Sequence, residues 1–518
     1  MIPMRVTNNI TQGRYLSSNN RAQTNMLKSY TRIMTQRKFN RVSEDPINGS
    51  KAMIIRRQLR DIDIYRDNLS TSKELFNAAE TNLSKVAHDL YISVEEQLTA
   101  AGNGTHDDME LKIYTTSLEQ TAAEMVDTLN GDFSERQIFG GTNNSVTPFG
   151  MNCVVVKDEE GNVMYPPYYD RYYKADGSLK DGVNFSDIPK NVTYNDVPVD
   201  FNAIGDMVFA DGTVGSLQSG KYSIYVYKDV SDIGNDKNKP IEIDIDVTAA
   251  VANRDNSLIF PGSKPIYVDI GLGIKYDENY EVDPQTALDI SLNGAAITGS
   301  GVSFSEEWVK NNIEVGEDGK RRVKDTEIYV TAEKAMKEYG VKTVEELEAL
   351  GIETKVEHRV VDSESKTHLE EADVTLYKVV TKNLSGIFSN NLMQLTFDAS
   401  AALKDGGYNS TTTNFDYDKT QNTTNGDQAY INGVIDRANL ANRGVLTSIT
   451  TLGSKQSSIE FYETKMDSYE YNLDERQNLV EGTDMYEEIS NYWNIKAAYE
   501  AWLKIGTQVI PNSIFNFI

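Results

Sequence analysis

Few side chains in this sequence could carry out chemistry. None of its four histidines has a second histidine or a cysteine at the spacing of a zinc site: His88, His106, His358 and His368. The only cysteine, Cys153, has no basic residue close by, so a buried, unreactive thiol is expected rather than a nucleophile. A single cysteine also excludes an internal disulfide. We therefore predict that the protein has no catalytic site and no metal site, and that it is not an enzyme.

Three groups of residues are weak candidates for a ligand-binding site. Gly271 and Gly273 form a glycine pair without the lysine of a phosphate-binding loop. Asp244 and Asp246 share one face of an alternating segment and could bind calcium, although a solvated strand face is the better interpretation. A group of tyrosines could stack on sugars or pack within a loop: Tyr165, Tyr168, Tyr169, Tyr172 and Tyr173. No cofactor is predicted from any of these patterns.

Composition narrows the class of protein further. The 518 residues suggest about three domains. With 51 Lys and Arg against 78 Asp and Glu, the net charge is −27, so nucleic acid and anionic membranes are poor partners. The mean hydropathy is −0.49, and no apolar run approaches the length of a membrane span. The N-terminus has no apolar segment of the kind found in a cleaved secretory signal, so export without one is expected.

The elements that position the side chains divide into two helical arms and a different middle. No proline lies between residues 47 and 147 or between 285 and 510, whereas eight of the twelve lie within 151–382. Because proline breaks helix interiors, long helices are predicted in the arms. Ser43-Glu44-Asp45-Pro46 predicts a helix start, with a capping side chain and two acids in the first turn.

Both arms carry an apolar row with a period of seven, which is typical of a coiled coil. We call the two rows together the rod seam: Ile55, Ile62, Leu69, Phe76, Leu83 and Leu90 in the N-terminal arm, and Val445, Leu452, Ile459, Met466, Leu473 and Val480 in the C-terminal arm. Neither row is stable in water alone, so we expect the two arms to pair with each other. Packing of each row in an ordinary helical bundle is the alternative.

The chain ends differ from the rod. Residues 5–40 carry few apolar groups. The C-terminal stretch instead has a broad apolar and aromatic face, which we call the terminal face: Ile489, Tyr492, Ile495, Tyr499, Trp502 and Leu503. Such a face predicts an assembly interface whose helices fold fully only against neighbouring subunits.

The middle, 151–382, predicts a β-rich region. Strands are expected at Tyr222–Tyr227, Ile241–Val247, Ile266–Ile270, Ile328–Val330 and Val374–Val380. A capping box at Thr343 and Glu346 predicts one helix. Residues 405–428, rich in Gly, Asn, Thr and Asp, predict a loop before the last long helix.

The arms resemble the bacterial flagellin superfamily. The segment Asn40-Arg-Val-Ser-Glu-Asp-Pro-Ile-Asn-Gly-Ser50 is similar to its N-terminal rod, and Asp45-Pro46 is similar to the hook–filament junction branch, the hook-associated protein 3 family. Phe139-Gly-Gly-Thr142 resembles the exit of that branch into its outer domain. Arg443 through Leu473 and the closing 512–518 resemble the C-terminal rod and terminus. The similarity covers 1–149 and 383–518.

The resemblance implies a mainly α fold with an inserted β-rich region, in which 1–40 and 482–518 are terminal assembly helices. It implies a helical rod domain from 41–149 and 383–481, and outer domains from 151–382. It further implies a structural adaptor ring on the extracellular flagellum. Expected partners are hook-associated protein 1, flagellin, further copies of this chain and a cytoplasmic export chaperone, with export through the flagellar type III channel. A filament flagellin, or a binding module or adhesin carried by the insert, are the alternatives.

Overall fold

The computed structural model describes residues 8–103, 108–233, 239–278, 280–362, 369–403 and 427–509. The chain forms two compact units. Unit 1 consists of Met1–Ser70, Asp269–Ala287 and Ser458–Ile518, and unit 2 of Thr71–Val268 and Leu288–Ser457. This division crosses two continuous helices, so the domain ranges predicted from the sequence stay a prediction.

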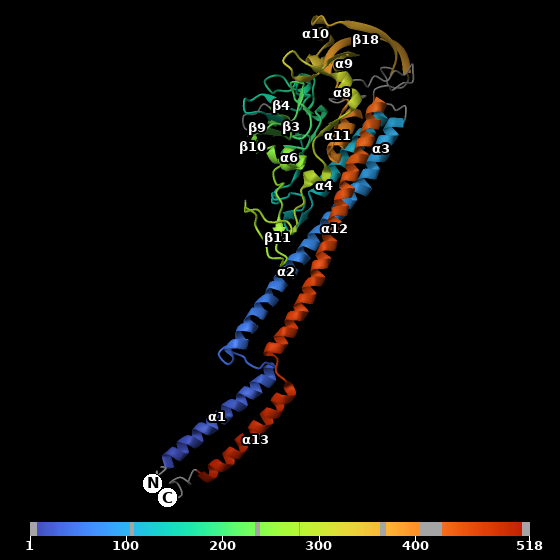
Figure 1. Ribbon diagram of the computed structural model, residues 1–518. Helices are drawn as coiled ribbons and strands as arrows, with labels where there is room; N and C mark the ends of the chain where they lie inside the picture. The colour runs from blue at the N-terminus through green and yellow to red at the C-terminus, as the bar shows by residue number, and fades with distance from the viewer. Residues whose placement is uncertain are drawn as a thin grey trace. The chain divides into compact units, whose positions relative to one another are not determined.

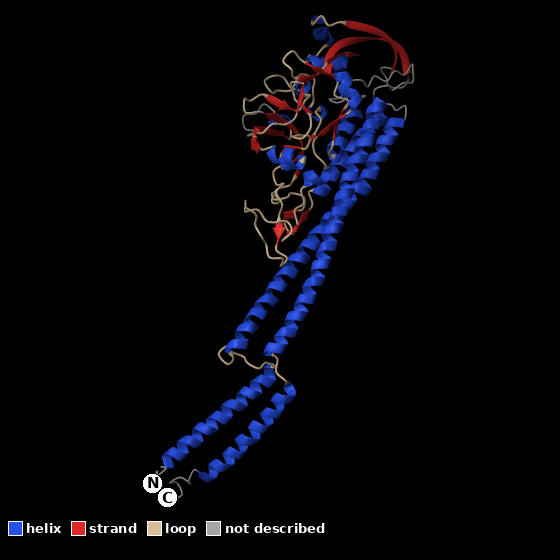
Figure 2. Ribbon diagram, in the orientation of Figure 1, coloured by secondary structure: helices blue, strands red, loops and turns tan. Residues whose placement is uncertain are grey.

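Both arms are helical, which confirms the predicted fold class (Figure 2). The N-terminal arm contains α1 Asn8–Thr35, α2 Pro46–Ser84, a π-helical turn η1 Lys85–Leu90, α3 Tyr91–Asn103 and α4 Asp108–Leu129. The C-terminal arm contains α11 Leu392–Leu403, α12 Asp427–Glu481 and α13 Met485–Val509. The predicted loop at 405–428 lies almost wholly outside the described residues, and α12 already begins at Asp427.

Helix α2 begins at Pro46, two residues later than the sequence pattern suggested. The Asp45 carboxylate accepts hydrogen bonds from the Asn48 backbone N–H at 3.1 Å and from its side-chain amide at 2.7 Å. These bonds lower the pKa of Asp45. Glu44 accepts from the Asn40 backbone N–H at 3.0 Å instead. Asp45 is thus the cap and Glu44 precedes it, which corrects the prediction that both acids occupy the first turn. The reason is that Pro46 takes the first helical position, where no N–H is needed.

In unit 1, α2 and α12 run antiparallel. Arg66 donates to Asp467 and Glu470 at 2.6 and 2.5 Å, and Arg56 donates to Glu481 at 2.7 Å. Helices α1 and α13 also lie alongside each other (Figure 1).

The same helix pair continues within unit 2. The Gln456 amide donates to Asn77 at 2.9 Å and to Glu80 at 3.0 Å, and the Asn442 amide donates to the Ala87 carbonyl at 3.1 Å. Partner numbers on α12 fall as those on α2 and η1 rise, as in an antiparallel pair. The N-terminal and C-terminal arms therefore pack against each other, as predicted.

The middle of the chain forms small antiparallel sheets in unit 2 (Figure 2). The largest has the order β10-β9-β3-β5-β6 with β4 paired to β3, and further sheets have the orders β14-β15-β8-β7 and β16-β18-β17. Three two-stranded sheets are β1-β2, β11-β12 and β13-β19. Each of the five predicted strands is present at least in part. However, β19 lies beyond residue 382 and pairs with β13, so strand pairing extends past the predicted end of the insert.

The strand bounds are β1 Asp132–Phe133, β2 Arg136–Gln137, β3 Phe149–Lys157, β4 Val163–Tyr165, β5 Asn191–Tyr194, β6 Val197–Pro198, β7 Met207–Val208, β8 Thr213–Gly215, β9 Gly220–Tyr227, β10 Ile241–Ile245, β11 Tyr267–Val268, β12 Leu288–Asp289, β13 Val302–Phe304, β14 Ile313–Val315, β15 Arg321–Val323, β16 Asp325–Thr331, β17 Thr354–Asp362, β18 Leu369–Lys382 and β19 Ile387–Ser389. Short helices between them are α5 Tyr169–Tyr172, η2 Phe185–Asp187, η3 Val230–Asp232, α6 Thr248–Asn253, η4 Asn256–Ile259, α7 Gly294–Thr298, α8 Glu306–Asn312, α9 Ala332–Tyr339 and α10 Val344–Ala349. The Thr343 hydroxyl caps α10 by accepting from the Glu346 N–H, which is one half of the predicted capping box. The Glu346 carboxylate accepts from the Lys342 N–H at 2.9 Å, one residue before the cap.

Helix α11 is the element of the C-terminal arm that packs between the arm helix α4 and strand β5 of the insert. Ten of its twelve residues are buried. On one side the Ser400 hydroxyl donates to the Thr115 carbonyl of α4 at 3.3 Å, and on the other the Gln394 side chain accepts from the Val192 N–H of β5 at 2.6 Å. The Asn391 side chain caps its start by accepting from the N–H groups of Met393 and Gln394. This helix therefore ties the insert to the arm helices.

Candidate assembly surface

The rod seam is buried along nearly its whole length. All six residues of the N-terminal row are at most 8% exposed, and in the C-terminal row only Val480, at the end of α12, is not buried. Phe76 has no exposed surface, and the Lys455 ammonium lies over its ring. Leu69 and Leu473 are likewise fully buried. The seam therefore acts as the internal core of the paired arms rather than as a free surface.

The terminal face is only half covered. Helix α13 packs on α1 through the Tyr15 hydroxyl, which donates to the Trp502 carbonyl at 3.0 Å, and through ring contacts of Tyr15 with Trp502 and of Tyr30 with Tyr492. The Ser29 hydroxyl donates to the Glu488 carboxylate at 2.6 Å. Tyr15 and Ser29 are buried by these contacts. The two helices thus run antiparallel, with a narrow polar and aromatic contact between them.

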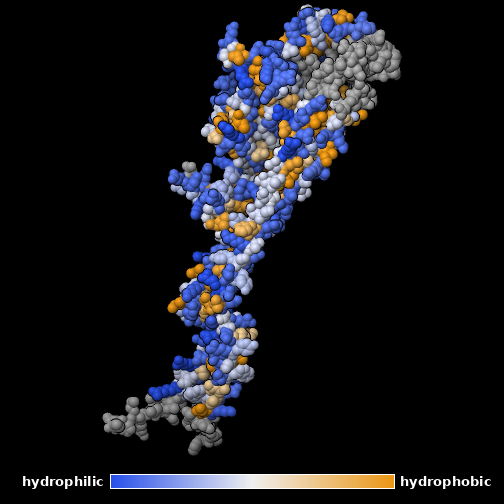
Figure 3. All heavy atoms as spheres, turned by 45° about the vertical axis from the view of Figure 1, so that its right-hand side comes forward, coloured by the Kyte–Doolittle hydropathy of each residue, from blue (hydrophilic) through white to orange (hydrophobic). Residues whose placement is uncertain are grey.

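Apolar surface remains exposed on both helices. Of the six predicted residues, Ile489, Trp502 and Leu503 are 39, 38 and 43% exposed, whereas Tyr492, Ile495 and Tyr499 are half-buried. The terminal helices also expose apolar side chains that were not predicted from the sequence: Tyr486, Trp493 and Ile505 on α13, and Leu27 and Met34 on α1. Figure 3 shows apolar atoms at the surface of this part of the chain among polar ones. Tyr486 and Trp493 are seven residues apart, and so are Leu27 and Met34, so helical spacing could have indicated both pairs.

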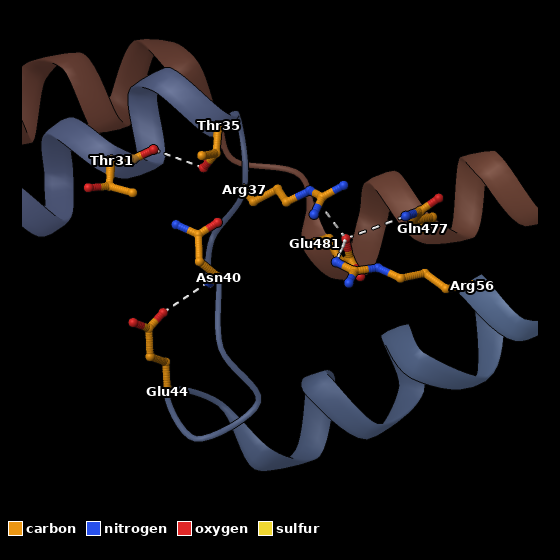
Figure 4. Close-up of polar contacts among 8 residues, drawn as sticks. All are labelled: Thr31, Thr35, Arg37, Asn40, Glu44, Arg56, Gln477 and Glu481. Carbon is orange, nitrogen blue, oxygen red and sulfur yellow. Dashed lines mark hydrogen bonds and ion pairs between the residues drawn. The ribbon is translucent and has the colours of Figure 1, made fainter.

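An ion cluster around one buried carboxylate joins the terminal helices to the long helices, and we call it the elbow cluster: Arg37, Arg56, Gln477 and Glu481 (Figure 4). One carboxylate oxygen of Glu481 lies 2.7 Å from the Arg56 guanidinium, 3.6 Å from that of Arg37 and 3.4 Å from the Gln477 amide. The Glu481 side chain is 3% exposed, whereas those of Arg56 and Arg37 are 41% and 46% exposed. The second oxygen of Glu481 is buried without a hydrogen-bond partner.

Backbone hydrogen bonds reinforce the elbow. The Lys38 N–H donates to the Glu481 carbonyl at 2.7 Å, and the Thr483 N–H donates to the Gln36 carbonyl at 3.0 Å. They form an isolated antiparallel bridge between Arg37 and Gly482. The α1–α2 connection and the α12–α13 connection are therefore tied to each other, and Glu481 places a charge acceptor between them. Neither the buried glutamate nor its two arginines stood out in the sequence, because they are far apart along the chain.

The structure shows the surroundings of the cysteine and of two of the histidines that were considered as reactive or metal-binding residues. Cys153 is buried, and burial raises the pKa of its thiol to about 12, which makes it a poor nucleophile. His88 is exposed on η1, His358 pairs with Asp373 at 2.8 Å, and His106 and His368 lie outside the described residues. Within the described ranges no three His, Cys, Asp or Glu side chains are arranged to hold a metal ion.

Of the glycine pair and the strand acids, Gly271 has a packing role, whereas Gly273 faces open space. Gly271 has φ +79°, and a Cβ there would lie 2.7 Å from the Tyr65 ring, so the glycine permits a close approach of this loop to α2. Asn68 donates to the carbonyl of the neighbouring Asp269 at 2.9 Å. Asp244 and Asp246 are exposed, and the Asp246 carboxylate accepts from the Thr248 N–H at 2.9 Å.

The tyrosine group is packed internally, which corrects the sugar-stacking alternative. Tyr169, Tyr172 and Tyr173 are at most 8% exposed in a core cluster with Cys153. The rings of Tyr169 and Tyr173 stack on each other at 4.9 Å, and Tyr165 is 4% exposed. The faces needed by a sugar are thus covered by protein. The physical reason is that this aromatic run folds back onto β3, whose apolar side chains need a cover.

Comparison with known proteins relates the N-terminal arm to bacterial flagellins. Residues 6–144 match the sequence model of the bacterial flagellin N-terminal helical region. This range runs through α1, α2, α3 and α4, so the match supports the resemblance to the flagellin superfamily for the N-terminal arm, which is a flagellin-type arm. No curated protein sequence matches the chain.

Solved structures that align with most of this chain include flagellar proteins. One assigned as a flagellar hook-associated protein of Vibrio parahaemolyticus is 10% identical, with 85% of this chain and 99% of that chain covered and a TM-score of 0.38. FlgL of Xanthomonas campestris is 12% identical over 81% and 98%, with a TM-score of 0.33. Flagellar hook-associated protein 3 of Legionella pneumophila is 9% identical over 83% and 98%, with a TM-score of 0.30. The flagellin match, and not these structures, supports the assignment of the N-terminal arm.

Proposed function

We propose that this chain is a structural adaptor of the bacterial flagellum that joins the hook to the filament. The observation that carries the proposal is a flagellin-type N-terminal arm that pairs antiparallel with the C-terminal arm and leaves apolar side chains exposed on both terminal helices. Exposed apolar surface of this kind suits contacts with neighbouring subunits. The Asp45-Pro46 helix start favours the junction branch over filament flagellin.

The proposed partners follow from the same surface. Further copies of this chain form a ring, with hook-associated protein 1 on one side and flagellin on the other. Before export by the type III route, a cytoplasmic chaperone covers the terminal face, because an exposed apolar helix would otherwise promote aggregation. The mature protein is extracellular. No helix among the described residues is long and apolar enough to cross a membrane. We assign no catalytic role.

Filament flagellin is the second candidate, supported by the same N-terminal match. The abundance of the chain in sheared flagella separates the two, since a flagellin dominates and a junction protein is a minor component. A sugar-binding role for the tyrosine group of the insert is not retained, because its rings are buried.

The test is a deletion strain complemented with Trp502→Asp, Leu503→Asp. Both side chains are about 40% exposed, so much of their apolar surface is free for a partner. We expect the deletion and the double variant to shed flagellin into the medium and to lose motility. The expected effect on the isolated protein is local, at the α1–α13 contact, because Trp502 touches Tyr15.

The matched control is Tyr276→Asp, Tyr280→Asp, which charges two exposed aromatic side chains of the insert, 62 and 88% exposed. We expect this variant to assemble normally. Normal motility of the Trp502, Leu503 variant, with flagellin retained on the cell, would contradict the proposed interface. Normal flagella in the deletion strain would contradict the junction function itself.

A further inference from the structure

A small pocket in unit 2 holds two carboxyl groups, Asp200 and Asp398. Its volume is about 60 Å³, room for only a few water molecules. Asp200 follows β6 in the insert, whereas Asp398 lies on α11. The pocket therefore lies where the insert meets the helix that ties it to the arms. The other residues that line it are Tyr165, Pro167, Tyr168, Asn191, Met207, Val208, Val302, Leu384, Ile387, Ser389 and Gln394.

The two carboxyls have only neutral hydrogen-bond donors. Asp200 accepts from the Ser389 hydroxyl at 2.5 Å and from the Tyr165 hydroxyl at 3.2 Å. Asp398 accepts from the Gln394 amide at 2.9 Å. A chain of hydrogen bonds continues from Tyr165 to Asn191 and on to Tyr168.

No lysine, arginine or histidine side chain is among the residues that line the pocket. The titratable groups that face the pair are the phenols of Tyr165 and Tyr168, and burial raises the pKa of both, so they are neutral at physiological pH. On α11 the only other polar lining side chain is the Gln394 amide. The carboxyls are consequently not balanced by any cation in the pocket.

Two uncompensated carboxyls in one small pocket repel each other when both are ionised. We propose that the Asp200–Asp398 pocket is a proton-sensitive contact between the insert and helix α11, which is held when at least one carboxyl is protonated and weakened when both are charged. Burial raises the pKa of Asp200 to about 6 and raises that of Asp398 as well, the latter also through the charge of Asp200.

The sign of the effect follows from these directions. A carboxyl with a raised folded-state pKa binds a proton in the folded protein at a pH where the unfolded chain has lost it. Its contribution is therefore present below the ordinary pKa near 4 and is lost as pH rises through about 6. The insert is thus attached to α11 more firmly in mild acid than at pH 8. Because α11 also contacts α4, the change reaches the arm helices.

The test compares the full chain with Asp398→Asn between pH 5 and pH 8. The amide keeps the shape of the carboxylate, and its oxygen can still accept from Gln394. Asp200→Asn is less suitable, because its amide group would face the Ser389 and Tyr165 hydroxyls. The control is Asp127→Asn, an exposed carboxyl on α4. We expect the melting temperature of Asp398→Asn relative to the natural chain to rise by about 3 °C or more from pH 5 to pH 8, with no such trend in the control.

Hydrogen exchange gives the local readout. In the natural chain, exchange of 392–403, corrected for intrinsic rate, should speed up from pH 5 to pH 8, and Asp398→Asn should abolish the increase. Infrared spectroscopy of the natural chain should show a protonated carboxyl that disappears over this range, which needs no variant. A melting difference independent of pH, or a less stable Asp398→Asn at pH 8, would overturn the proposal. Stability at pH 8 that depends on added Mg²⁺ or Ca²⁺ would also overturn it, in favour of a cation site.

Discussion

Neutralising Glu481 should release the terminal helices while leaving the long helices paired. In Glu481→Gln the side chain keeps its shape, but the guanidinium groups of Arg56 and Arg37 lose their only carboxylate within 4 Å in the elbow cluster. Breaking a fully buried pair by removing one partner costs about 3–5 kcal/mol. Here both arginines are more than 40% exposed, so water recovers part of their solvation and the loss is smaller.

We therefore expect about 2 kcal/mol from this substitution, which corresponds to about 30-fold more frequent opening of the elbow. Hydrogen exchange of the purified full-length monomer measures that opening by segment. Exchange should accelerate at 36–38 and 481–483, where the backbone bridge lies, and along α1 and α13. It should not change at 445–459, because the rod seam there does not depend on Glu481.

Glu470→Gln is the matched control. Glu470 lies on the same helix and pairs with Arg66 at 2.5 Å, but both side chains are about one-third exposed. An exposed pair of this kind contributes about 0.2–1 kcal/mol, so we expect little change in exchange. Two outcomes would refute the idea that burial makes the ion pairs of Glu481 stabilising: equal changes in hydrogen exchange for the two substitutions, or a Glu481→Gln protein that exchanges like the natural chain.

Two further predictions use matched pairs of residues. Phe76→Ala, at a fully buried seam position, should lower the free energy of unfolding by about 3–5 kcal/mol in denaturant titrations. Phe461, on α12, is 66% exposed, so Phe461→Ala should change the free energy of unfolding little. Similar losses of stability in the two variants would show that the seam is not the core. Gly271→Ala and Gly273→Ala both place a side chain at positive φ, but only the first brings its Cβ to 2.7 Å from Tyr65. We expect Gly271→Ala to be less stable by about 1–3 kcal/mol than Gly273→Ala in the same titrations, and equal stability would contradict the close approach.

Much of the helical framework could be predicted from local patterns. The seven-residue rows of Phe76 and Leu452 place apolar side chains on one helix face whatever their partner, because helix periodicity is a property of the backbone. The absence of proline allows the helices to be long, and an alternating segment such as 241–247 shows its strand in the same way. Their burial in the structure agrees with the patterns.

Other features depend on residues distant in sequence. Tyr169 and Tyr173 could as well have faced a ligand, and only the fold of the chain back onto Cys153 shows that they are core residues. The Asp200–Asp398 pocket could not be predicted, since each aspartate is by itself an ordinary polar residue and becomes unusual only when the other lies across the pocket.

The sequence by itself determined the long arm helices, five of the strands and the apolar faces of the arms, because these follow from spacing along one segment. The tertiary structure decided which groups lose their water. Glu481 is nearly devoid of exposed surface only because the α1–α2 and α12–α13 connections meet there. Desolvation and charge pairing depend on distances between segments hundreds of residues apart, and no local pattern contains those distances.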